Sequence, residues 1–327
     1  MTKHRDLSFD LLRAIGLLSI ILAHVSPPSL LFQFRTFDVV MMVCVSTVTY
    51  TEYSRPKPYF QYLKGRIKRL LFPAWIYILL LGLIFGAISY ATNTPTAYPL
   101  KTLLIGIFSL SGVGYLWVIR VFLYNAFINP FIPRLKKYNQ VKVFCGVVLS
   151  YVLYTIVRDF CMGSKIPYVP TLAEASFISF FAYGIIAVVS YLLYHQTTKI
   201  LLCSITIISI ILLVTIYVDG GFMPNVFKYP PALQYILWGL LVVSLSFFLI
   251  RIYPIKTMPS FLTFVSENSL WVYFWHLIPV NFIEHYRELC PQFIVDSWWL
   301  KYLLIVIFAT FMTYSQNYVI KLVKRKI

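Results

Sequence analysis

Two ionisable residues, Arg13 and His24, interrupt the first apolar stretch of the chain, which begins at Asp10 and ends at Val25. An ionisable side chain at the bilayer centre costs roughly 2.5–3.5 kcal/mol on insertion scales, so such residues are functional candidates. Eleven residues at about 100° each come within about 20° of three full helical turns, and they rise about 16 Å. A helix here would therefore present a guanidinium and an imidazole on one face, about half a bilayer apart. That arrangement suits a long ligand with an anionic head and a reactive tail.

Each of these residues has a chemical interpretation and a plainer one. The neutral imidazole of His24 can take a proton from a hydroxyl near pH 7, as attack on a thioester requires, but it could equally be a satisfied polar residue at a helix end. The guanidinium of Arg13 matches phosphate with two parallel hydrogen bonds, or its stem could snorkel so that the charge reaches the membrane surface.

A second basic feature lies in an expected inner loop, Tyr62-Leu-Lys-Gly-Arg66-Ile-Lys-Arg69-Leu-Leu-Phe-Pro73. Arg66 and Arg69 are three residues apart and would share a helical face, and Pro73 suits the first turn of the following helix. With Arg13 they would form one cytoplasmic anion site for a nucleotide-phosphate head group such as that of coenzyme A. Basic residues that only orient the membrane helices are the alternative.

Later apolar stretches carry further candidates. Arg120 lies within a span and is expected to face the bundle interior or a wet cavity, whereas nearby Trp117 could simply belong to the interfacial aromatic belt. Glu267 and His276 place two ionisable groups in one apolar run, with a position at the outer mouth as the alternative for His276. Asp38 could orient a histidine, pair with Arg35, or act only as an N-terminal helix charge.

Composition indicates a membrane protein. The 327 residues are 60% hydrophobic and 12% charged, with a mean hydropathy of +0.78, whereas ordinary globular proteins are about 25% charged. No segment is long and polar enough for a separate domain, so residues 1–327 are expected to form a single membrane domain. The formal charge of +17 could suggest nucleic-acid binding, but the distribution of Lys and Arg argues against it.

Apolar runs predict an all-α polytopic protein with about ten transmembrane helices and one short interfacial or re-entrant helix at 100–112. The expected spans are 9–26, 36–52, 71–91, 115–133, 143–158, 173–193, 200–217, 233–250, 262–282 and 300–320. If both termini are cytoplasmic, most of the 28 Lys and Arg residues fall on the inner side, Lys3 and Arg5 included. The basic excess therefore largely sets topology.

The five cysteines predict no metal site, because no pair has ligand spacing. Cys44, Cys145 and Cys203 lie in apolar spans and are expected to be small buried residues. Cys161 and Cys290 both fall in expected outer loops, where a disulfide could form.

The ordered set of features resembles the membrane-bound acyltransferase 3 family. The resemblance rests on Arg13 and His24, the Phe-Asp opening of the second span, the Arg66-x-x-Arg69 and Pro73 segment, the Leu116-Trp117 span, and the late span with Ser266, Tyr273 and His276. It covers nearly the whole chain. One departure stands out: the family usually has a Phe-Phe-x-x-Ser-Gly run in span two, but here Met-Met-Val-Cys-Val-Ser46-Thr47 lacks the glycine, which places close helix packing there in doubt.

The resemblance implies a bacterial inner-membrane O-acyltransferase that uses cytoplasmic acyl-CoA, usually acetyl-CoA, to modify a cell-surface or lipid-linked polysaccharide. Arg13, Arg66 and Arg69 would hold the donor phosphates, with Arg120 and Trp117 also on the donor side. His24 would be catalytic, with Asp38 and Glu267 as supporting acid–base candidates. Ser266, Tyr273 and His276 would contact the acceptor. Some relatives append an extracytoplasmic hydrolase-like domain. This chain ends at Ile327, so we expect either that the acceptor reaches the membrane domain itself or that a separate partner completes the transfer.

Two other functions stay open at this stage. A glycan or lipid transporter would also have about ten spans and buried charges, although inverted repeats and broken midplane helices are not evident. A degenerate family member could act as an accessory in polysaccharide assembly or export. Expected partners are membrane lipids and the polysaccharide or lipid-linked sugar acceptor. A homo-oligomer or polysaccharide-assembly partners are left open, and no metal or nucleic acid is expected.

Overall fold

The computed structural model describes residues 6–55, 57–109, 113 and 115–326, and these residues form helices joined by short loops. Lys3 and Arg5, and the end of the expected 100–112 helix, lie outside the described residues. The longer helices are α1 (Leu7–Ala23), α3 (Asp38–Tyr53), α4 (Tyr59–Thr92), α5 (Leu100–Ser109), α6 (Trp117–Ile128), α7 (Gln140–Met162), α9 (Ser179–His195), α10 (Thr198–Val218), α11 (Leu233–Ile252), α13 (Ser269–His285) and α15 (Trp298–Lys326). The shorter ones are α2 (Ser29–Phe34), η1 (Arg35–Phe37), η2 (Ile132–Lys137), α8 (Val169–Ala173), η3 (Glu174–Ile178), α12 (Ser260–Glu267), η4 (Arg287–Leu289) and α14 (Gln292–Asp296).

The predicted all-α polytopic architecture is confirmed. Over the described part of the chain, seven helical stretches are long and apolar enough to cross a membrane. They are Ser29–Tyr53, Tyr59–Thr92, Gln140–Met162, Val169–His195, Thr198–Val218, Leu233–Ile252 and Trp298–Lys324. The expected spans 9–26, 115–133 and 262–282 coincide with shorter helices, so a total of ten spans stays a prediction.

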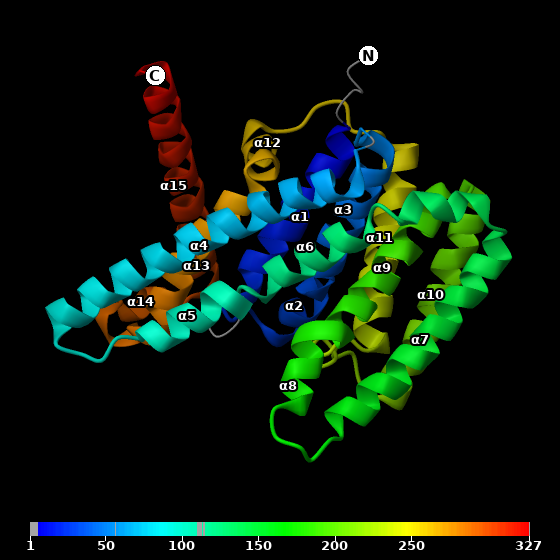
Figure 1. Ribbon diagram of the computed structural model, residues 1–327, viewed down its shortest axis with the longest axis horizontal. Helices are drawn as coiled ribbons and strands as arrows, with labels where there is room; N and C mark the ends of the chain where they lie inside the picture. Colours follow the sequence, from blue (N-terminus) through cyan, green and yellow to red (C-terminus); the bar gives the residue numbers. More distant parts are fainter. Residues whose placement is uncertain (1–5, 56, 110–112, 114, 327) are drawn as a thin grey trace.

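Helices α1 and α3 lie side by side at the centre of the bundle (Figure 1). Helix α1 also packs against α12, and α3 against α9 and α11. By contrast, α7 and α10 lie at the periphery and expose apolar side chains, as helices that face lipid do. Helix α1 begins and α15 ends on the same side of the bundle (Figure 1), but which side is cytoplasmic stays a prediction.

The basic segment before Pro73 is not a loop, as the sequence suggested, but the first half of the 34-residue helix α4. The helix begins after Pro58 and continues through Pro73. Since proline has no N–H, the carbonyl of Arg69, four residues earlier, loses its helical hydrogen bond there. The continuous helix fixes Arg66 and Arg69 on a rigid element.

The expected span 262–282 is broken at Asn268, which has non-helical dihedral angles and separates α12 from α13. The Asn268 side chain donates to the carbonyl of Phe264 and accepts a 2.8 Å hydrogen bond from Asn317 on α15. The break places Ser266 and Glu267 at a helix junction rather than in the middle of a span.

Only part of the cysteine prediction is correct. Cys44 is buried, but Cys145 and Cys203 are exposed, because α7 and α10 turn these faces outward. Cys161 and Cys290 are both free thiols in the structure, so the disulfide considered for them is not formed.

Close packing around α3 comes from glycines on its neighbours, since α3 lacks the family glycine. A Cβ added to Gly16 of α1 would lie 3.0 Å from Met42 Cγ, and one added to Gly239 of α11 would lie 2.6–2.7 Å from all three side-chain carbons of Val40. Val40 is fully buried. Helix α3 therefore packs closely without a glycine of its own, because α1 and α11 supply the glycines at the contacts.

We expect Gly239→Ala to destabilise the protein, because the new methyl group overlaps a β-branched side chain that cannot swing away. Overpacking of this kind costs about 1–3 kcal/mol. Thermal unfolding of the detergent-purified variant would measure the loss, and adding Val40→Ala should restore part of it. Gly146→Ala is the matched control, since nothing lies within 4 Å of its added Cβ. Equal melting temperatures for wild type and Gly239→Ala would contradict the close packing.

Candidate active site

A cavity of about 810 Å³ is lined by residues of α1, α3, α4, α6 and the α12–α13 junction, and by the segment that joins α3 to α4. In the part of the chain that the structure describes, its charged lining residues are five basic and one acidic: Arg13, Arg55, Lys57, Arg66, Arg69 and Glu267. Like charges repel strongly where water is partly excluded. This lining therefore favours an anionic ligand.

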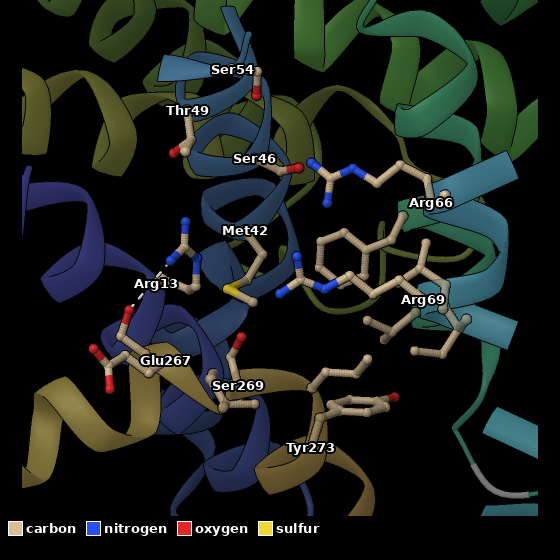
Figure 2. A pocket seen from close by; sticks show the side chains of 18 of the residues that line it. Arg13, Met42, Ser46, Thr49, Ser54, Arg66, Arg69, Glu267, Ser269 and Tyr273 are labelled. Atoms are coloured by element: carbon tan, nitrogen blue, oxygen red, sulfur yellow. Dashed lines mark hydrogen bonds between the residues drawn. The ribbon is translucent and has the colours of Figure 1, made fainter. Parts of the chain in front are cut away.

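The arginines approach the cavity from opposite sides (Figure 2). Arg66 and Arg69 extend from α4, with the Arg66 guanidinium directed toward Ser46 of α3, and Arg13 extends from α1 on the far side. Ser46, with its hydroxyl beside Arg66, also lines this region. Guanidinium and hydroxyl groups around one space are suited to phosphate oxygens, which accept several hydrogen bonds at once.

Arg13 does not simply snorkel to the surface, because a polar cluster holds it at the cavity wall. Its Nη1 donates to Asp10 Oδ1 at 2.9 Å and lies 3.4 Å from Ser266 Oγ. Ser266 in turn donates to Asp10 at 2.9 Å, and both Asp10 and Ser266 are buried. The cluster fastens α12 to α1 and holds the Arg13 side chain at the cavity wall.

Three residues of α1 at helical spacing, Arg13, Leu17 and Ile20, line the cavity. His24 is the next residue on this stripe, which agrees with the same-face spacing read from the sequence. His24 caps the C-terminal end of α1 and is partly exposed. Its ring lies against Tyr115, with centroids 4.0 Å apart, and stacks on His276 at 5.5 Å. His24 therefore lies one turn of α1 beyond Ile20, just past the inner end of the cavity, which is the end that Ile20 lines.

His276 is fully buried, so the alternative of a position at the outer mouth is wrong. Neither ring nitrogen makes a hydrogen bond of ordinary geometry to the described residues. On the same helix, Tyr273 lines the cavity with its ring, which lies 5.1 Å from the His276 ring, and its hydroxyl donates to the carbonyl of Tyr115. Tyr273 thus connects the cavity wall to the surroundings of His24.

The remaining sequence candidates lie away from the cavity. Asp38 does not touch a histidine: it pairs with Arg35 at 2.7 Å and with Lys228 at 3.0 Å, all three being buried. Arg120, half-buried, approaches the carbonyl of Ala175 at 3.5 Å. Trp117 packs edge-on against Tyr229 and under the Lys228 ammonium.

Of the eleven candidates, six line the cavity together: Arg13, Arg66, Arg69, Ser266, Glu267 and Tyr273. His24 and His276 lie together beyond its inner end, and Asp38, Trp117 and Arg120 lie elsewhere.

Sequence reasoning missed several residues around this site. The partnership of Asp10 with Arg13 was readable, because the two are three residues apart on one helix. Arg55 and Lys57 were read only as topological charges. Nothing in the sequence pointed to Tyr115, and Lys228 read as an ordinary basic residue of an outer loop although it is buried.

Comparison with known proteins agrees with the motif resemblance. Residues 6–316 match the acyltransferase 3 family, described as an acyltransferase domain. No curated protein and no solved structure matches the chain. The match covers nearly the whole chain. The matched residues include nearly all of the apolar helices and the residues that line the arginine-rich cavity. The chain therefore belongs to the acyltransferase 3 family and is a multi-pass membrane acyltransferase.

Proposed function

We propose that this protein transfers an acyl group, acetyl in the first instance, from coenzyme A to a hydroxyl of a cell-surface or lipid-linked polysaccharide at the bacterial cell membrane. One observation carries the proposal most: the arginine-lined cavity is continued along α1 by a stripe of residues that ends at His24. Membership of the acyltransferase 3 family supplies the reaction class, which is acyl transfer.

The lining fits the head group of coenzyme A. That head group carries a pyrophosphate and a ribose phosphate, and guanidinium groups bind such oxygens in a fixed bidentate geometry. Arg66 and Arg69 on one wall and Arg13 on the other would hold it, with Ser46 as a further donor. The cavity of about 810 Å³ lies within the range of about 300–1,000 Å³ usual for small-molecule sites.

The length of α1 fits the rest of the donor. The eleven helical steps from Arg13 to His24 rise about 16 Å. Leu17 and Ile20, which lie between them on the same face, offer an apolar wall to the pantetheine arm. A donor anchored at the arginines would therefore carry its thioester toward His24.

The chain's own part in the reaction is proton transfer and positioning. His24 takes the proton of the acceptor hydroxyl as its oxygen attacks the thioester carbonyl. The tetrahedral intermediate collapses, the C–S bond breaks, and the sulfur leaves as a thiolate that recovers the proton from the imidazolium. The products are an ester of the acceptor and free coenzyme A.

The acceptor would reach His24 from the side away from the cavity. His24 stands at the opposite end of α1 from the basic residues and is partly exposed. Donor and acceptor would thus approach one imidazole from opposite sides of the bundle. A transporter would need no such thioester-directed geometry, and transfer of labelled acetyl from acetyl-CoA by purified membranes separates the two functions.

We expect His24→Ala to abolish acyl incorporation, because the reaction loses its base, while membrane insertion and protein level stay unchanged. Mass spectrometry of the glycan from cells that carry the variant would measure the loss. His195→Ala is the control, since His195 pairs with Glu52 on other helices, at 2.9 Å. Normal glycan acylation in His24→Ala cells would remove His24 from the mechanism.

We expect Arg66→Ala to raise the KM for acyl-CoA by about 10–100-fold with little change in kcat, the effect of losing one charge-assisted hydrogen bond of about 1.5–3 kcal/mol. Initial rates at varied donor concentration would measure it. Lys68→Ala removes the same charge from the same turn of α4, but Lys68 does not line the cavity. If the basic segment served only topology, the two variants would behave alike.

A further inference from the structure

We propose that Tyr115 is the positioning residue of His24, and that Tyr273 and Glu284 act on His24 by holding Tyr115 in place. The inference rests on the proposed function of His24 as base. It assigns the Tyr273 hydroxyl to the geometry of the base rather than to substrate contact.

The ring of Tyr115 is the group in closest ring contact with His24. The two centroids lie 4.0 Å apart with an interplanar angle of 53°, whereas His276 stacks on His24 at 5.5 Å. Together the two rings confine the imidazole of a residue that stands at a helix end, where the chain leaves α1. An imidazole at such a place is free to adopt other rotamers unless its neighbours confine it.

Tyr115 itself has an unfavourable backbone conformation. Its φ is +59°, in the left-handed region that bulky residues rarely enter. Such residues persist only where their surroundings hold them, and they concentrate at active sites. Here two surrounding groups do so.

The first group is the hydroxyl of Tyr273, which donates a 2.5 Å hydrogen bond to the Tyr115 carbonyl. The second is the carboxylate of Glu284, near the end of α13, which accepts from the Tyr115 hydroxyl at 3.3 Å. Both groups lie on one helix, α13, which also carries His276. Helix α13 therefore places both rings that confine His24.

The Tyr273 hydroxyl is consequently already used within the protein, although its ring lines the donor cavity. If its role were to bind substrate, its removal would raise a KM. If it acts through Tyr115, its removal would lower kcat and leave the donor KM unchanged, because the ring that forms the cavity wall remains.

The test is Tyr273→Phe in the full-length protein, with Tyr115→Ala and the double variant. We expect Tyr273→Phe to lower kcat at least about 10-fold, as expected for a misplaced base, with the donor KM unchanged. In the double variant, kcat should be no lower than in Tyr115→Ala alone, because one residue acts through the other. Tyr124→Phe is the matched control: it also removes a tyrosine hydroxyl from a backbone carbonyl, at 2.6 Å, but away from His24. Wild-type kcat in Tyr273→Phe, a raised KM alone, or multiplied losses in the double variant would each overturn the proposal.

A second readout does not depend on acyl transfer. Diethyl pyrocarbonate modifies exposed neutral imidazoles, and mass spectrometry reports the rate for each histidine. We expect Tyr273→Phe, and also Glu284→Ala, to raise the rate at His24 several-fold while His195, which serves as the internal standard of folding, keeps its rate. An unchanged His24 rate in both variants overturns the positioning role. A raised rate in a protein that transfers no acyl group supports the positioning role and rejects the proposed function.

Discussion

Concentrated positive charge in an otherwise apolar bundle is the constraint on which the rest of this structure depends. Arg13, Arg66 and Arg69 face one cavity, and among the described residues a single acidic side chain, Glu267, lines it with them. The buried carboxylate of Asp10 compensates Arg13 directly. The arginines of α4 are instead carried on a helical extension that leaves Arg69 exposed, so that water can solvate its charge. The bundle thereby retains strong anion-binding groups without enclosing them in a dry core.

At the far end of α1 the charged side chains are paired with one another, two cations with one carboxylate. Asp38 lies between Arg35 and Lys228, and Asn225 accepts a further hydrogen bond from Arg35 at 2.9 Å. Buried ion pairs contribute little net stability, but breaking one is costly because it leaves a charge unpaired. This cluster fixes the loop between α10 and α11 against the start of α3, close to the aromatic groups around His24. Near the start of α1, basic side chains thus line an open cavity. Near its end, the charged side chains are buried in ion pairs and lie close to the aromatic rings around His24.

Much of this arrangement was accessible from the sequence because helical periodicity is regular. The shared face of Arg13 and His24 and the pairing of Arg66 with Arg69 follow from spacing alone, and the family motifs point in the same direction. The sequence left several partners open for Asp38, and the structure shows the pairing with Arg35. A charge in an apolar stretch must find a partner, but the sequence does not say whether that partner is a ligand or another side chain. Asp38 found Lys228, which is 190 residues away. Pro73 was misread because a proline at the first turn and a proline inside a long helix share one local sequence. The left-handed conformation of Tyr115 depends on contacts from α13 and leaves no sequence signal.

The most direct test of this account is an experimental structure of the protein with coenzyme A bound. The account predicts the phosphates between Arg13 and the Arg66–Arg69 face, with the pantetheine arm along Leu17 and Ile20 and the sulfur next to His24. Coenzyme A bound elsewhere would contradict it, and so would coenzyme A bound at the arginines with its sulfur directed away from His24.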